Sequence, residues 1–453
     1  MFEKLFPGSK DYPKNEPIKT LTLGFQHAFA MSCATILVPL LTGLDVGVAL
    51  FTAGIGTLIF HFCTKGKVPT FLGSSFAFIA AISAIIGNPE FGVSKGEQLA
   101  AAMGGIIAAG FLYLVLSIII RVFGNNLLNT LFPPVVRGVG IAIIGLNLAG
   151  VAINNIQYNN GFEMFSAGYY WSWGIALFTC LLAIFLSSYG KGMVKMASIV
   201  IALVSGYVLT LIAVKTGLAP AGLMNLSAIG ARSWIEVPNF TLPSINWRAI
   251  SMIAPIAIVT MVEHVGDVYA NSAVVGKDFT KDPGIPRTLL GDGLATMVAG
   301  FVGGPPNTTY SENTAVLAAT GNYNPASLRV AAVIAAIISF FGKAIGIIET
   351  IPNVVLGGSC IVLYGMISSV GLRTLVENHV DFTKNRNLCI AAVMLVLSMG
   401  GAVIGAAGFS FSGIGLGIIA GIILNLIMPD KSAGDGGFIA HSVDKSEVNP
   451  ERD

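Results

Sequence analysis

The chain has 453 residues, of which 54% are hydrophobic and 11% are charged. A soluble domain carries charges at roughly 25% of its positions, so this composition excludes an ordinary soluble protein and indicates a polytopic membrane protein. The net charge is only +2 and the basic residues are spread over loops, so a nucleic-acid partner is not expected.

Apolar stretches of about 20 residues, the length that crosses a ~30 Å hydrocarbon core, recur along the whole chain. We predict fourteen spans, of which two, at 70–88 and 306–321, are short and polar at the start. The other twelve are predicted at 19–41, 47–63, 97–123, 127–153, 169–188, 192–215, 248–275, 285–303, 325–348, 352–372, 387–407 and 411–429. Interrupted spans in corresponding halves are typical of a transporter's binding site.

Basic residues indicate the orientation of these spans. An even number of spans puts both termini on one side, and the loops predicted on that side carry Lys65, Lys67, Arg121, Lys191, Lys195, Lys277, Lys281, Lys384 and Arg386. Loops on the cytoplasmic side are enriched in Lys and Arg. We therefore expect a multi-pass protein of the cell membrane with both termini in the cytoplasm.

An internal repeat is detectable in the sequence. One shift superposes His27 on His264, Gln26 on Glu263, Gly54 on Gly291, Pro69 on Pro306 and Ser74 on Ser311. A second match relates FPPVVRG at 132–138 to IPNVVLG at 351–357. Two halves of seven spans follow, and an odd number of spans inverts the second half relative to the first.

The eighth predicted span carries two carboxylates on one helix face. Glu263, Asp267 and Asn271 follow one another at intervals of four residues, which places them on the same side. Each charge costs about 2.5–3.5 kcal/mol at the centre of a spanning helix, so we expect a substrate or proton site, with an interhelical hydrogen-bond cluster as the structural alternative. His264 points elsewhere and is either an interhelical contact or a proton relay.

Two further charges lie near the starts of predicted spans. Asp292 is expected to pair with Asp267 or with a backbone donor, or to cap its helix. Arg137 is expected near the cytoplasmic end of the fifth span, where a long basic side chain extends to the membrane surface.

The segment GGPPNTTYSENTAVLAATG at 303–321 is the most unusual part of the chain. A polar, helix-breaking segment at membrane depth is tolerated only where it is buried in protein or lines a cavity. Glu312 follows two prolines where a half-helix would begin, so its carboxylate and the free N–H groups of the helix start could bind a planar heterocyclic amide. Phe76 lies in the corresponding segment of the first half, where it would provide a backbone N–H and a ring face or simply pack in the core.

The sequence lacks the motifs of other mechanisms. No phosphate loop of an ATPase, no H-E-x-x-H metal motif and no Ser/Lys pair with helical spacing is present, so we expect neither an enzyme nor a cofactor. A carboxylate in a cavity of low dielectric can carry a proton near neutral pH, which favours proton symport, with sodium coupling left open. An anion carrier is a distant alternative because the site carboxylates would repel an anion.

These residues resemble the nucleobase–ascorbate transporter family, also called nucleobase:cation symporter-2, with bacterial uracil permeases as the nearest branch. The resemblance covers about residues 18–430 and is carried by QHAFAMSCATILVP at 26–39, TFLGSSFAFI at 70–79, VEHVGD at 262–267 and the 303–321 segment. It implies an all-α protein with fourteen spans in two inverted repeats, short strands in the broken spans 3 and 10, proton symport and a homodimer in membrane lipid.

The resemblance also implies a division into a core domain and a gate domain. The implied segments are the N-terminal cytoplasmic residues 1–17, core residues 18–125, gate residues 126–217, core residues 245–350, gate residues 351–429 and a cytoplasmic tail at 430–453.

Residue roles carried over from the family are as follows. Glu263 and Glu312 would hold the nucleobase N–H groups. The other substrate contacts would come from Phe76, Tyr310, Ser311 and, across from the gate domain, Tyr364. Residues that support the site or proton coupling would be Asp267, His27, Gln26, Asp292 and His264.

The sequence departs from the family pattern at positions that bear on the substrate. Uracil permeases of this type commonly have histidine at the position of Asp267 and asparagine at that of Asp292, and acidic residues at both resemble the xanthine branch. That branch usually has glutamine where this chain has Glu312. We therefore expect uracil as the substrate, with xanthine as the alternative.

Overall fold

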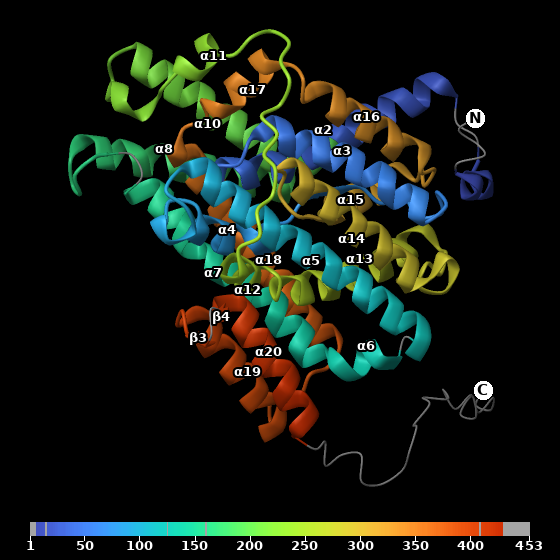
Figure 1. The fold of residues 1–453 in the computed structure, drawn as a ribbon. Helices are drawn as coiled ribbons and strands as arrows, with labels where there is room; N and C mark the ends of the chain where they lie inside the picture. Colours follow the sequence, from blue (N-terminus) through green and yellow to red (C-terminus); the bar gives the residue numbers. More distant parts are fainter. Residues whose placement is uncertain (1–5, 14–15, 125, 159–160, 407–408, 429–453) are drawn as a thin grey trace, which may run out of the picture.

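The computed structural model of the protein describes residues 6–13, 16–124, 126–158, 161–406 and 409–428. The described chain is mostly helical, with two pairs of short strands (Figure 1). The predicted tail at 430–453 lies outside the described residues, as does much of the predicted N-terminal segment.

Eight helices in the described ranges are long and apolar enough to cross a membrane. They are α2 (Pro17–Thr42), α3 (Val46–Cys63), α5 (Lys95–Phe123), α7 (Pro134–Gln157), α8 (Ala167–Tyr189), α10 (Ser198–Lys215), the stretch Trp247–Val275 formed by α12 (Trp247–Ile253) and α13 (Ile256–Val275), and α18 (Asn353–Glu377). A ninth candidate is the pair α16 (Ala326–Ile338) and α17 (Gly342–Glu349), bent by 86°. These helices confirm a multi-pass membrane protein, and the number fourteen stays a prediction.

The other helices are shorter or more polar. They are η1 (Pro7–Asp11), η2 (Phe76–Phe78), α4 (Ile79–Ile85), η3 (Pro89–Phe91), α6 (Asn126–Leu131), α9 (Met193–Met196), η4 (Ala221–Leu223), α11 (Ser227–Ala231), η5 (Thr280–Gly284), α14 (Ile285–Val302), α15 (Ser311–Thr320), α19 (Asn385–Met399) and α20 (Gly413–Ile427).

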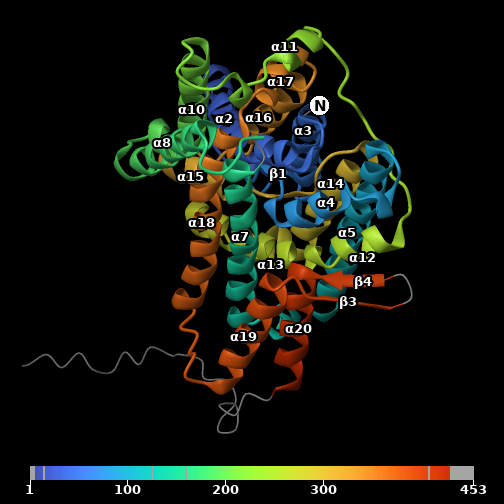
Figure 2. The same ribbon diagram turned by 90° about the vertical axis from the view of Figure 1, so that its left-hand side faces the viewer.

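The helices pack in two groups. In one group α3 packs on α14 and α16, α14 on α5, and α16 on α2. In the other, α18 runs beside α7 and also contacts α8, while α19 packs on α20 and α7 (Figure 2). Helix α13 touches both groups, since it contacts α5 and α14 as well as α7 and α20. This position places the side chains of α13 between the two groups.

A two-stranded antiparallel sheet joins distant parts of the first group. Strand β1 (Leu72–Ser74) pairs with β2 (Asn307–Thr309), with Gly73 opposite Thr308. All six strand residues are buried. Each strand leads into a helix, β1 into η2 and α4 and β2 into α15, so two helix starts are held side by side. A second strand pair, β3 (Val403–Ala406) with β4 (Phe409–Ser412), connects α19 to α20.

Glycine allows a close helix contact in the first group. A Cβ atom built on Gly110 of α5 would lie 2.7 Å from the carbonyl oxygen of Gly293 of α14, and one on Gly293 would lie 2.9 Å from that of Gly110. Small residues let membrane helices approach until their backbones touch. These two glycines therefore set the distance between α5 and α14.

Candidate functional site

Three carboxylates predicted for the site come from two helices that converge at the strand pair. Glu263 and Asp267 lie one turn apart on α13, and Glu312 lies in the first turn of α15. The Thr309 hydroxyl donates a 2.6 Å hydrogen bond to Oδ2 of Asp267. Because Thr309 ends β2, this bond fixes α13 to the strand pair. Sequence reasoning missed Thr309, although it lies within the polar segment.

An inner cavity of about 70 Å³ brings together five of the six predicted substrate residues, all except Tyr364. It is lined by Phe76, Ala77, Ile144, Glu263, Thr308, Thr309, Tyr310, Ser311, Glu312, Leu363 and Ile367. The lining thus includes both glutamates, the start of α15, and side chains of α7 and α18 from the other helix group. This arrangement offers anionic acceptors beside apolar walls, which suits a small planar ligand with N–H groups.

A larger cavity of about 580 Å³ adjoins the inner one, and we call it the vestibule. It is lined by Arg137, Ile141, Glu263, Gly266, Asp267, Tyr269, Ala270, Ser311, Ile367, Val370, Arg373, Thr374, Glu377 and Asn378. Glu263, Ser311 and Ile367 line both cavities. The vestibule lies at the end of the helices where α7 begins and α18 finishes. The two cavities therefore form one path from the carboxylates toward that end.

An aromatic contact joins the wall of the inner cavity to the second helix group. The rings of Phe76 and Tyr364 meet edge to face, with centroids 6.2 Å apart and planes at 75°. Tyr364 is 2% exposed and lies on α18. It packs against Phe76, which lines the cavity, but is not itself among the residues that line it, so its role as a substrate contact stays a prediction.

The first span supports the site through Asn313. The Nδ2 atom of Asn313 lies 3.2 Å from Nδ1 of His27 and donates a 3.1 Å hydrogen bond to the His27 carbonyl oxygen. His27 is fully buried, and Asn313 follows Glu312 directly. The Oε1 atom of Gln26 is also buried and has no hydrogen-bond partner among the described residues. His27 thus acts on the position of α15, and no sequence pattern indicated Asn313 as its partner.

The prediction for Asp292 was wrong in its position and partner. Asp292 lies two turns inside α14 instead of at its start, so it does not cap the helix. Its Oδ2 atom is 2.8 Å from Nδ1 of His264, and both side chains are fully buried. The pair joins α13 to α14 on the side of α13 that faces away from Glu263, because adjacent residues on a helix point about 100° apart.

Asn271 shares a helix face with the carboxylates but has a structural role. Its Nδ2 atom donates to the Pro69 carbonyl oxygen at 2.8 Å and to the Thr70 hydroxyl at 2.9 Å. These bonds hold the chain that leads into β1. One helix face therefore carries both ligand-facing and structural groups.

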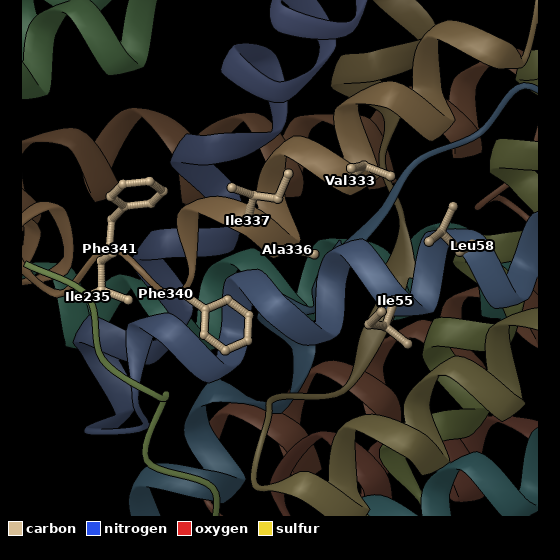
Figure 3. Close-up of a pocket in the computed structure, with 8 residues that line it drawn as sticks. All are labelled: Ile55, Leu58, Ile235, Val333, Ala336, Ile337, Phe340 and Phe341. Atoms are coloured by element: carbon tan, nitrogen blue, oxygen red, sulfur yellow. The ribbon is translucent and has the colours of Figure 1, made fainter.

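Another cavity of the described residues differs from the two at the carboxylates. An apolar cavity of about 400 Å³ is lined by Ile55, Leu58, Ile235, Val333, Ala336, Ile337, Phe340 and Phe341 (Figure 3), and their side chains provide no polar group. Within the described ranges, no cluster of three or more His, Cys, Asp or Glu side chains could hold a metal ion.

Sequence comparison relates the chain to membrane permeases. Residues 18–406 match the model of the xanthine/uracil permeases, described as a permease family. A probable uracil permease of Pasteurella multocida is 42% identical over 411 residues, which cover 91% of this chain and 94% of that protein. The uracil permease of Bacillus caldolyticus is 42% identical over 420 residues, and that of Bacillus subtilis is 39% identical over 441 residues. Their alignments cover 91% and 94% of this chain, and 92% and 96% of those proteins.

Solved structures with the same fold are much more distant in sequence. The transmembrane domain of the cyanobacterial bicarbonate transporter BicA aligns with a TM-score of 0.61 and 16% identity over 89% of this chain and 96% of that one. SLC26A9 aligns with a TM-score of 0.66 and 16% identity over 92% of this chain, which spans 65% of the SLC26A9 chain. At this identity the likeness concerns the fold alone.

Proposed function

Since the chain belongs to the xanthine/uracil permease family of nucleobase transporters, we propose that it imports uracil together with a proton across the cell membrane. The observation that carries this proposal is the inner cavity, where Glu263 of α13 and Glu312 of α15 face the same space. Uracil presents two N–H donors in one plane, and carboxylates are strong acceptors for such donors. The start of α15 adds backbone N–H groups for a carbonyl oxygen of the base.

Uracil is preferred over xanthine for two reasons. The relatives at about 40% identity are named as uracil permeases, and Glu312 fits that branch. Xanthine is the second candidate because Asp267 and Asp292 resemble the purine branch. Bicarbonate or another anion is the least favoured cargo, because four carboxylates, those of Glu263, Asp267, Glu312 and Glu377, line the two cavities.

The proposed mechanism is alternating access of a core domain against a gate domain. The core would comprise residues 18–125 and 245–350, and the gate residues 126–217 and 351–429, in two inverted repeats of seven spans. The packing of α3, α5, α14 and α16 as one group and of α7, α8 and α18 as another supports this division. The vestibule would then be the open path to the cytoplasm, where both termini would lie. A homodimer surrounded by membrane lipid completes the proposal.

Proton coupling is assigned to the carboxylates of the two cavities. Glu263 is shared by both cavities, so it can meet the base on one side and water on the other. Asp267, His264, Asp292, His27 and Gln26 would support it as coupling or positioning groups. A carboxylate that binds a proton in the loaded state and releases it to the cytoplasm would link the two fluxes.

Uptake of radiolabelled uracil and xanthine into proteoliposomes tests the proposal. We expect uracil to accumulate when the outside is acidic and a protonophore to abolish accumulation. If neither base were taken up, nucleobase transport by this protein would be refuted. If xanthine alone were taken up, the substrate would be xanthine and not uracil. Accumulation that follows a sodium gradient and resists the protonophore would show that the coupling ion is sodium and not the proton.

A further inference from the structure

The vestibule contains an arginine without a counter-charge. Arg137 lies in the first turn of α7, at the end of the span where it was expected, and it lines the vestibule. Its Nε atom is buried and has no hydrogen-bond partner among the described residues. A charged side chain that lines a cavity of a membrane protein without a partner indicates a functional role.

The other arginine of the vestibule differs in this respect. Arg373 of α18 lies 3.5 Å from Glu377, one turn further along the same helix, and both side chains are about two-thirds exposed. This local pair is satisfied within one element and faces solvent. Arg137 differs from Arg373, because no acidic side chain of its own helix group lies within ion-pair distance of it among the described residues.

Two acids of α13, Glu263 and Asp267, line the vestibule together with Arg137, and Asp267 is the better match for Arg137. Glu263 also lines the inner cavity, where it would bind the base. Asp267 and Arg137 line the vestibule but not the inner cavity. The Thr309 hydroxyl occupies Oδ2 of Asp267, which fixes the carboxylate on the strand pair and leaves its other oxygen for a second donor.

We propose that Arg137 pairs with Asp267 across the vestibule when its walls close, so that Arg137 is a positioning residue for the closed state. The inference rests on the proposed alternating access. Closing the vestibule would remove water from both groups, and a desolvated charge is strongly unfavourable unless it is paired and hydrogen-bonded. The planar guanidinium suits a carboxylate better than a lysine ammonium does.

Parallel measurements of uracil uptake and uracil binding test this role. We expect Arg137→Gln and Asp267→Asn each to lower the uptake rate about tenfold, which corresponds to about 1.4 kcal/mol, while Kd changes less than about threefold. Arg137→Lys should retain part of the rate. The matched control is Arg373→Gln, which removes a vestibule arginine that already has its own partner and should change uptake less than about twofold.

The exchange variant carrying Arg137→Asp and Asp267→Arg should transport faster than either single reversal, because it restores an opposite pair. Wild-type uptake by Arg137→Gln, an equal loss of binding and uptake, or an exchange variant no better than the single reversals would overturn the proposal. Monodispersity and uracil binding of each variant confirm that it is folded.

Chemical cross-linking gives a readout that does not depend on the substrate. In a variant with Arg137→Cys and Asp267→Cys, a short bifunctional thiol reagent should link the two positions, whereas each single cysteine variant should show no such link. Absence of the link in the presence and in the absence of uracil would overturn the pairing. If the link forms but the wild-type protein carries neither uracil nor xanthine, the proposed substrate fails and the pairing stands.

Discussion

The hydroxyl of Tyr310 donates a 2.9 Å hydrogen bond to the carbonyl oxygen of Ser74. These residues are 236 positions apart in the sequence, and each lies at the point where a strand gives way to a helix. The Thr35 hydroxyl, on α2, donates in turn to the Tyr310 oxygen at 3.2 Å. One side chain therefore joins the first span to both halves of the strand pair.

Replacing Tyr310 with phenylalanine should weaken this junction while keeping the ring. The Ser74 carbonyl and the Thr35 hydroxyl would lose a buried partner, and an unsatisfied buried group costs about 1–3 kcal/mol. We expect a lower apparent Tm of the purified protein and weaker uracil binding. Tyr170→Phe, at a side chain that is 62% exposed, is the control and should leave both unchanged; equal effects of the two substitutions would contradict this role.

Glu263→Gln and Glu312→Gln should each reduce uracil affinity about 10- to 100-fold. Each substitution exchanges an anionic acceptor for a neutral amide of the same size, and a hydrogen bond to a charged group contributes about 1.5–3 kcal/mol. Isothermal titration with uracil measures the change. The control is Glu90→Gln, at an exposed residue paired with Arg248. If both site variants bound uracil normally, neither glutamate would be a ligand.

The buried pair of His264 and Asp292 should contribute to stability rather than to substrate affinity. Removal of one partner leaves the other buried without its partner, so Asp292→Leu should cost about 3–5 kcal/mol. The double variant His264→Leu with Asp292→Leu should recover much of that loss, because two apolar groups then pack together. Thermal unfolding in detergent measures the effect. A double variant that is as unstable as the sum of the single ones would show that the two residues act independently.

A cluster of charges around Arg232 ties the loop at 217–246 to the helices and should respond to acid. The Arg232 guanidinium lies 2.5 Å from Glu349 and 3.5 Å from Asp45, and it also bonds Glu236. The hydrogen bond from Arg232 holds the pKa of Glu236 below its usual range. A carboxylate whose pKa is lowered in the folded state stabilises the fold at pH values above its unfolded pKa of about 4.3. This stabilisation is lost as the pH falls below that value and through the folded-state pKa.

We therefore expect proteolysis of this loop to accelerate as the pH falls below about 4.3, measured with an acid-active protease. Glu236→Gln should flatten that dependence, since it removes the titrating group. Arg232→Lys should lower stability at neutral pH by about 1 kcal/mol, because a lysine cannot make the forked contacts. A pH profile that is identical in the wild type and Glu236→Gln would contradict the assignment.

Some of the site was predictable because membrane burial makes polar residues conspicuous. Glu263, Asp267 and Glu312 stand out in an apolar chain, and in the structure they line adjoining cavities. The exact partners were not predictable. Helical spacing placed Asn271 beside the carboxylates, but it could not reveal that Pro69 and Thr70 already use its amide. Asp292 was misassigned for the same reason, since its partner His264 comes from another helix.

The sequence by itself determined that the chain is a multi-pass membrane protein, which residues are polar at membrane depth, and which permease family it resembles. These properties follow from hydropathy and from local residue order. Only the tertiary structure decided which polar groups satisfy one another and which remain available, because hydrogen bonds and ion pairs depend on atoms brought within about 3 Å by helices far apart in the chain. The Thr309 hydroxyl bonds Asp267, whereas Nε of Arg137, which lines the vestibule, has no hydrogen-bond partner among the described residues, and no pattern in the sequence separates these two outcomes.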